Sequence, residues 1–224
     1  WMQEVAVIDK GGKVLLARAY YQLDRKDDSL RLVEEVMAET EAEGQVPRES
    51  WLNFQWVLYY EKNEYRKAVD VNRVMLTHYP KIKYWKQLSA MYASLEEPMK
   101  ELIALDLTYI QDGLDEEKHF IALAYQYLGV DVPYKAATIL EKALNEGKVE
   151  ATEKNLVLLG TAYQQAEEYA KASPIFERAA KLSNEGNTYS RLAKVYLNLN
   201  ENEKALIAAR SALKKGKLKR EDLV

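Results

Sequence analysis

The chain has 224 residues with a formal net charge of −3, and 48% of its side chains are hydrophobic and 30% charged. Glycine (9 residues) and proline (5) are too scarce for the many turns of an all-β fold, and the absence of cysteine excludes a disulfide framework, a zinc–thiolate site and a cysteine nucleophile. No apolar run approaches the ~18 residues that a membrane span needs, and the acidic balance argues against a general nucleic-acid binder, because phosphate affinity needs clustered cations.

The first residues precede the repeating part of the sequence. Residues 1–8 are interpreted as the remnant of a preceding helix. The start Trp1-Met2-Gln3-Glu4 lacks the basic end and the apolar stretch of a signal peptide, and it is not a native translation start. We therefore expect the sequence to begin inside a longer protein, so that any targeting segment lies upstream.

Six tyrosines set a register along the chain, with spacings of 39, 33, 35, 36 and 33 residues. These register tyrosines are Tyr20, Tyr59, Tyr92, Tyr127, Tyr163 and Tyr196. A leucine stands four residues before all of them except Tyr59, and a small residue stands three before in five of the six copies. Offsets of three and four residues share one helical stripe, so each register tyrosine predicts an amphipathic first helix.

A second helix is predicted downstream of each register tyrosine. Nine residues after the tyrosine, four of the six copies have alanine, and polar links such as Asn200-Glu201-Asn202 precede that position. Small residues at such positions let two antiparallel helices approach closely. The unit is therefore a helix–turn–helix of about 34 residues. Six copies are expected in a single all-α domain spanning 1–224, at about 10–43, 49–82, 83–115, 117–150, 153–185 and 186–219.

The repeat unit resembles the tetratricopeptide repeat (TPR), which pairs an aromatic–Leu–small–Tyr first helix with a small–aromatic–Ala second helix. The clearest copy has Leu156, Leu159, Gly160, Tyr163, Tyr169, Ala172, Phe176 and Ala179. The third copy departs from the pattern, since Glu101 stands where the family has a small residue. The resemblance implies an α-solenoid, wound into a right-handed superhelix, whose first helices line a concave groove.

The residue pattern offers no catalytic constellation. His78 and His119 lie in different repeats without a HExxH partner, and we interpret both as surface histidines. Carboxylate pairs such as Glu34-Glu35 are adjacent in sequence, so on a helix they point in different directions. We therefore expect a protein that is not an enzyme and that uses no metal and no cofactor.

The first helices have a second face, formed by the positions nine, six and two residues before the register tyrosine and one after it. In TPR proteins this face lines the groove. Its candidate binding residues are Tyr21, Asn53, Tyr60, Lys83, Lys86, Lys118, Tyr125, Lys154, Thr161, Gln164 and Lys194. The set is basic and aromatic in an acidic chain, which favours a protein or peptide partner of acidic character. The alternative is that these lysines only keep exposed helices soluble.

A narrower resemblance covers most of the chain. The runs 79–92, 132–137 and 179–216 are similar to those of γ-proteobacterial TPR proteins that accompany TonB–ExbB–ExbD energy-transduction systems. This resemblance implies a periplasmic, non-enzymatic scaffold that assists energised uptake across the outer membrane, for example of iron chelates, and binds a component of the TonB system.

A second interpretation remains open. The same repeats would serve a cytoplasmic TPR adaptor, a regulator or a chaperone-like protein. The residues upstream of Trp1 would discriminate the two, because a cleavable signal favours the periplasmic reading. The sequence fixes neither the oligomeric state nor whether the concave or the convex face is used.

Overall fold

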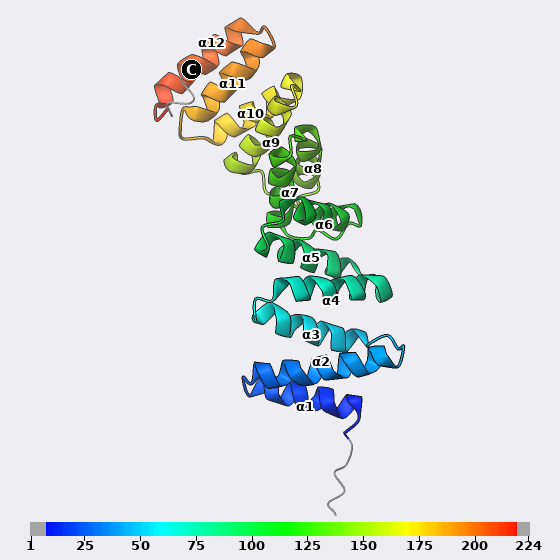
Figure 1. Cartoon of the computed structure of the whole chain (residues 1–224). Helices are drawn as coiled ribbons and strands as arrows, with labels where there is room; N and C mark the ends of the chain where they lie inside the picture. The colour runs from blue at the N-terminus through cyan, green and yellow to red at the C-terminus, as the bar shows by residue number, and fades with distance from the viewer. Residues whose placement is uncertain (1–7, 219–224) are drawn as a thin grey trace, which may run out of the picture. The chain divides into compact units, whose positions relative to one another are not determined.

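The computed structural model describes residues 8–218, which form twelve α-helices and no β-strand (Figure 1). The helices are α1 (Lys10–Gln22), α2 (Lys26–Ala42), α3 (Glu49–Glu61), α4 (Tyr65–His78), α5 (Ile82–Ser94), α6 (Pro98–Ile110), α7 (Glu117–Gly129), α8 (Pro133–Asn145), α9 (Glu153–Gln165), α10 (Tyr169–Leu182), α11 (Asn187–Asn198) and α12 (Asn202–Lys215). The all-α prediction is confirmed. The expected helix remnant at residues 1–8 lies outside the described residues except for Ile8, which is not helical, and the last residue of the sixth repeat also lies outside them.

The helices fall into two compact units, residues 1–113 and 114–224. In each unit an odd-numbered first helix packs against the even-numbered second helix that follows it, and that second helix packs against the next first helix. Figure 1 shows these hairpins following one another in chain order within each unit. Packing is therefore between neighbours in sequence, as in repeat proteins. The single 224-residue domain stays a prediction.

Each register tyrosine also closes its own first helix. The residue four positions after it has a positive φ of 54–59° in all six copies. In the fifth copy this residue is Glu167, and the next amide, that of Glu168, donates to the carbonyl oxygen of Tyr163 at 2.9 Å. A left-handed residue with this hydrogen bond is the Schellman arrangement, which satisfies carbonyls at a helix end. The same left-handed residue and the same hydrogen bond to the tyrosine carbonyl therefore recur in the turn of every repeat.

Small residues let the helices of one hairpin approach closely. A Cβ added at Gly160 on α9 would lie 2.9 Å from the Phe176 ring on α10, and Ala172 on the same helix is fully buried. The contact confirms the close approach that the small residues of the clearest copy predict. None of the helices in the described part of the chain is both long and apolar enough to span a bilayer.

Candidate peptide-binding site

A surface hollow of about 540 Å³ lies on the first helices of the second unit, α7, α9 and α11. Its lining residues are Tyr125, Leu128, Glu153, Lys154, Val157, Leu158, Thr161, Gln165, Glu185, Asn187, Thr188 and Arg191. We call it the α7–α9–α11 hollow. Three successive repeats contribute to it, so its residues lie in a row along the stack of first helices.

Half of the lining follows from the register. The positions nine, six and two residues before the register tyrosine and one after it supply six of the twelve lining residues. These six are Tyr125, Leu128, Lys154, Val157, Thr161 and Asn187. The structure therefore brings together three of the predicted binding residues, Tyr125, Lys154 and Thr161. Their role in binding stays a prediction.

The hollow is lined by aliphatic side chains and by one exposed aromatic side chain. Leu128, Val157 and Leu158 supply aliphatic surface from α7 and α9. Tyr125 is 51% exposed although it belongs to a packed helix. Pockets that bind ligands or peptides pair such apolar surface with a few placed polar groups. An exposed tyrosine also offers a partner a large contact area at a low cost in side-chain conformational entropy.

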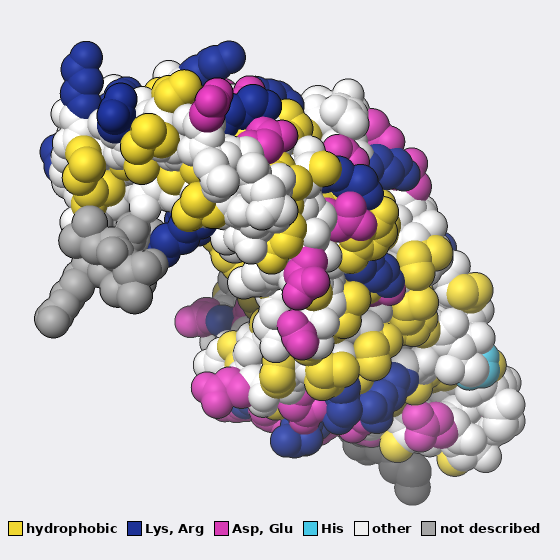
Figure 2. Space-filling model, turned by 90° about the horizontal axis from the view of Figure 1, so that it is seen from above, with side chains coloured by type: hydrophobic (Ala, Val, Ile, Leu, Met, Phe, Trp, Pro, Cys, Tyr) yellow, Lys and Arg dark blue, Asp and Glu magenta, His cyan; other side chains and the backbone are white. Residues whose placement is uncertain are grey.

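The charges of the hollow are mixed. Lys154 and Arg191 are balanced by the carboxylates of Glu153 and Glu185. Arg191 Nη1 donates to Thr161 Oγ1 at 3.1 Å, and Thr188 Oγ1 donates to Glu153 Oε1 at 3.0 Å. Figure 2 likewise shows basic and acidic side chains interspersed on the face that it presents. The site is therefore less basic than the predicted residues alone suggest.

A glutamate clasp joins neighbouring first helices at their N-terminal ends. The glutamate ten residues before a register tyrosine accepts a hydrogen bond from the residue eight before the next one. Asn155 donates to Glu117 at 2.6 Å, and Thr188 donates to Glu153. In the first unit the hydroxyl of Tyr84 donates to Glu49 in the same way. This clasp was not predicted from the sequence, although the spacing of the glutamates carries its signal.

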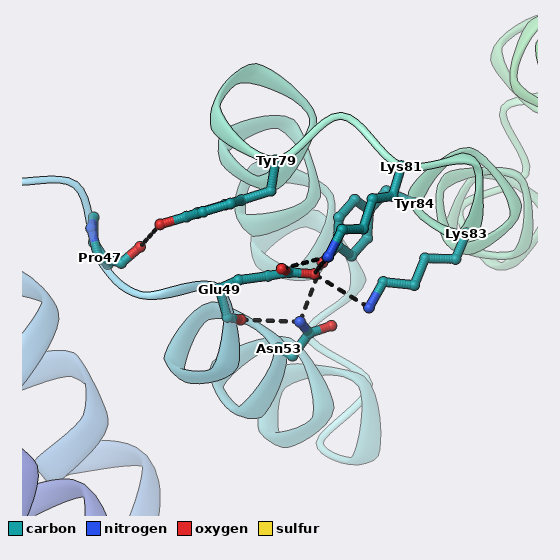
Figure 3. A network of polar contacts seen from close by, with 7 residues as sticks. All are labelled: Pro47, Glu49, Asn53, Tyr79, Lys81, Lys83 and Tyr84. Atoms are coloured by element: carbon teal, nitrogen blue, oxygen red, sulfur yellow. Dashed lines mark hydrogen bonds and ion pairs between the residues drawn. The ribbon is translucent and has the colours of Figure 1, made fainter.

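In the first unit, the clasp glutamate Glu49 also pairs with Lys83, one of the predicted binding lysines (Figure 3). Lys81 Nζ lies 2.6 Å and Lys83 Nζ 3.4 Å from the Glu49 carboxylate. The amide of Asn53 donates to the Tyr84 hydroxyl at 3.2 Å. Hydrogen bonds from Lys81, the larger effect, and from the Tyr84 hydroxyl lower the pKa of Glu49 to about 2. Lys83 and Asn53 therefore hold two repeats together, which is a structural role that the sequence did not indicate.

The other predicted residues of the first unit lie on α1, α3 and α5. The Tyr21 hydroxyl donates to Glu61 Oε1 at 2.6 Å, and this hydrogen bond raises the pKa of Tyr21. Tyr60 is exposed, and its ring stacks on Trp56 with 5.2 Å between centroids. Lys86 is half-buried on α5. No single hollow of those found in the described residues collects these side chains with Asn53 and Lys83.

The remaining predicted residues of the second unit lie beside the hollow. Lys118 pairs with Glu116 at 2.7 Å near the start of α7. Gln164 and Lys194 are half-buried on α9 and α11 and do not line the hollow. Arg191 does line it, although this residue was not predicted from the sequence. It stands five residues before a register tyrosine, a position at which Leu158 in the preceding copy is part of the core.

Three potential metal ligands lie close together at the start of α7. Oxygen and nitrogen atoms of Asp115, Glu116 and His119 lie within 4.8 Å of one another. Lys118 engages Glu116 and lowers the pKa of its carboxyl group. Both carboxylates are exposed, and His119 is half-buried whereas His78 is exposed. Exposed acidic groups at a helix start are favoured by the helix dipole alone, so this cluster does not indicate a metal site.

Comparison with known proteins identifies the fold. No family model and no curated protein matches the sequence. YrrB, described as a TPR protein with an unusual peptide-binding site, is similar with a TM-score of 0.59 and 14% identity over 84% of this chain and 94% of its own. MamA AMB-1 reaches 0.56 with 20% identity over 78% and 96%, and MamA MSR-1 reaches 0.53 with 20% identity over 74% and 95%. The chain has the all-α repeat fold of TPR proteins, which confirms the prediction from its tyrosine register.

Proposed function

We propose that the chain is a non-enzymatic scaffold that binds a segment of a partner protein in the α7–α9–α11 hollow. The observation that carries the proposal is that three successive first helices line one hollow. A row of contacts one repeat apart suits a peptide segment better than a compact small molecule. YrrB, which has the same fold, is described as having a peptide-binding site, and this description is in keeping with the proposal.

The chemistry of the hollow defines the segment that fits. Aliphatic side chains of the partner would cover Leu128 and Val157, while Tyr125 would pack beside them. An acidic group would lie near Lys154, whose side chain is exposed at the start of α9. A basic group would meet Glu185, which also lines the hollow. We therefore propose an apolar segment with acidic character near Lys154, as the basic groove residues predict.

Site-specific photo-crosslinking tests this proposal. A photoreactive phenylalanine analogue replaces Tyr125 in one variant, and in the control it replaces Tyr134, an equally accessible tyrosine on the second helix α8. We expect a partner adduct from position 125 and none from position 134. The charge reversal Lys154→Glu should reduce the adduct at position 125 at least tenfold at low salt, because a nearby carboxylate would then be repelled.

Two outcomes would contradict the proposal. Adducts of equal yield at positions 125 and 134 would show contact without a preferred face. An unchanged yield in Lys154→Glu would exclude the acidic segment while leaving the location intact. Circular dichroism of each variant provides the folding control, since Tyr125 and Lys154 are both exposed.

We further propose that the partner belongs to a TonB–ExbB–ExbD system and that the protein is periplasmic. The support is the resemblance of 79–92, 132–137 and 179–216 to TPR proteins that accompany such systems. Mass spectrometry of the adduct at position 125 tests the partner. Recovery of proteins without any TonB-system component would overturn it, and recovery of the protein in the cytoplasmic fraction of its natural cells would favour the adaptor interpretation.

A further inference from the structure

A second hollow, of about 270 Å³, lies inside the first unit, where the second helices α2 and α4 flank the first helix α3. We call it the α2–α3–α4 hollow. Its lining residues all fall between positions 37 and 74, well inside the described part of the chain. Second helices contribute to this hollow, whereas none contributes to the α7–α9–α11 hollow. The lining residues are Met37, Glu41, Leu52, Gln55, Tyr59, Lys67, Asp70, Val71 and Val74.

Gln55 departs from the repeat pattern at this hollow. It stands four residues before its register tyrosine, where the other five copies have leucine. Gln55 is only 8% exposed, so a polar amide is buried where the repeat calls for an apolar side chain. Its one side-chain hydrogen bond among the described residues runs from Nε2 to the Tyr59 hydroxyl at 3.5 Å, which is long for such a bond. Because a buried amide without good partners is costly, Gln55 favours a polar group that enters the hollow. The leucines that are buried at its position are Leu88, Leu123, Leu159 and Leu192.

The charges of the hollow leave one carboxylate unpaired. Lys67 Nζ lies 2.6 Å from the Glu64 carboxylate, and Asp70 lies 3.3 Å from Arg73 Nη1. Glu41, which also lines the hollow, is exposed and makes no side-chain hydrogen bond or ion pair with any described residue. A cation from a partner therefore complements this hollow better than an anion does.

The size and the apolar lining of the hollow define the group that fits. Its volume is half the 540 Å³ of the α7–α9–α11 hollow and below the roughly 300–1,000 Å³ of small-molecule sites, so it has room for one side chain. Val74 is half-buried, and Met37, Leu52 and Val71 are buried, so each presents only part of an aliphatic side chain. A long side chain with an aliphatic stem and a cationic end matches such a lining. Arginine suits it better than lysine, because its planar fork of donors can reach a carboxylate and an amide oxygen together.

We propose that the α2–α3–α4 hollow binds an arginine side chain of a partner protein. The guanidinium would donate to the Glu41 carboxylate and to Oε1 of Gln55, and the aliphatic stem would lie beside Val71 and Val74. This hollow takes a basic group, whereas the α7–α9–α11 hollow is proposed to take an acidic one, so the two units would bind partner groups of opposite charge. The two sites share no residue, so either can be absent without the other.

Nuclear magnetic resonance titration of the 224-residue chain with N-acetylarginine amide tests this proposal. We expect saturable shifts of the Gln55 side-chain amide and of the Val71 and Val74 methyl groups. N-acetylcitrulline amide has the same shape without the charge, and it should bind about tenfold or more weakly. Glu41→Gln removes the carboxylate and should weaken arginine binding by a similar factor. Gln55→Leu restores the residue of the other copies, so it should fold while losing the amide oxygen and most of the binding.

Matched controls make the same exchanges at exposed positions away from the hollow. Gln22→Leu on α1 and Glu203→Gln on α12 should bind the arginine probe like the unmodified chain. Circular dichroism confirms that all variants fold. Equal binding of the citrulline probe would overturn the proposal, as would unchanged binding in Gln55→Leu or the absence of shifts up to the solubility limit of the arginine probe. N-acetyllysine amide binding as tightly as the arginine probe would overturn the choice of arginine.

Discussion

The hydroxyl of Tyr163 on α9 donates a 2.8 Å hydrogen bond to Glu141 on α8, the second helix of the preceding repeat. The same contact joins Tyr59 to Glu34 and Tyr196 to Glu177. Burial is the larger cause and the hydrogen bond to the glutamate the smaller one, and together they raise the pKa of all three tyrosines well above the usual value. The register tyrosine therefore links two repeats by its side chain and closes its own helix by its carbonyl oxygen.

Removing this hydroxyl should destabilise the fold. We expect Tyr163→Phe to lower the free energy of unfolding by about 1–3 kcal/mol, because the half-buried Glu141 carboxylate loses its donor. Urea denaturation followed by circular dichroism measures the change. The control is Tyr60→Phe, in which the exposed ring keeps its stack on Trp56 and the stability should stay within about 0.5 kcal/mol. Equal losses in both variants would contradict the role of the hydrogen bond.

The register was predictable because the tyrosine serves two purposes at every repeat. Its ring fills the packing stripe, so leucine at one offset and small residues at another recur with it. Asp24, Asn63 and Asn200 at the helix-ending turn tolerate a left-handed backbone, so the sequence carries a signal for the turn in these copies. It was invisible at Glu96 and Glu167, since glutamate carries no turn signal.

The binding residues were predictable only in part, because side-chain partners depend on the neighbouring repeat. Helical periodicity placed Tyr125, Lys154 and Thr161 on one face, and the hollow contains all three. Periodicity does not show that the Glu49 carboxylate pairs with Lys83. From the sequence alone, Lys83 is expected to be exposed and unpaired. Helical periodicity therefore predicts which residues share the binding face. The contacts between neighbouring repeats then determine which charged side chains of that face can still pair with a partner.

Glycine at the left-handed turn position should stabilise the chain. Glu167 has φ 59°, a conformation that costs an L-residue about 1–2 kcal/mol, while glycine adopts it without a Cβ clash. Glycine loses more conformational entropy on folding, which costs about 0.5–1 kcal/mol and offsets part of this benefit. Glu167→Gly should therefore raise the free energy of unfolding by up to about 1 kcal/mol. Asn200→Gly is the matched control at the same turn position. Its gain should be smaller, because asparagine already tolerates this conformation, and a larger gain there would contradict the explanation.

Acid should weaken the clasp shown in Figure 3. The pKa of Glu49 is lowered from 4.5 to about 2 in the folded chain, so the folded state favours the carboxylate. Its contribution is present above about pH 4.5 and is lost as the pH falls towards 2. We therefore expect the stability difference between the unmodified chain and Glu49→Gln to shrink from pH 6 to pH 2. Glu203→Gln, on an exposed part of α12, should show no such trend in the same urea titrations.

The close approach of α9 and α10 should make Gly160 intolerant of even one methyl group. A Cβ there would lie 2.9 Å from the Phe176 ring, so the side chain of Gly160→Ala forces the helices or the ring to move. Overpacking costs about 1–3 kcal/mol, and the better helix propensity of alanine offsets up to about 1 kcal/mol of it. We expect a net loss of about 1–2 kcal/mol. Gly129→Ala is the control, because no atom lies within 4 Å of the added Cβ on α7 and the change should be neutral or stabilising.

If Phe176→Leu is combined with Gly160→Ala, the loss should be smaller than the sum of the single losses, since the smaller side chain relieves the clash. Strict additivity would place the effect of Gly160→Ala somewhere other than this contact.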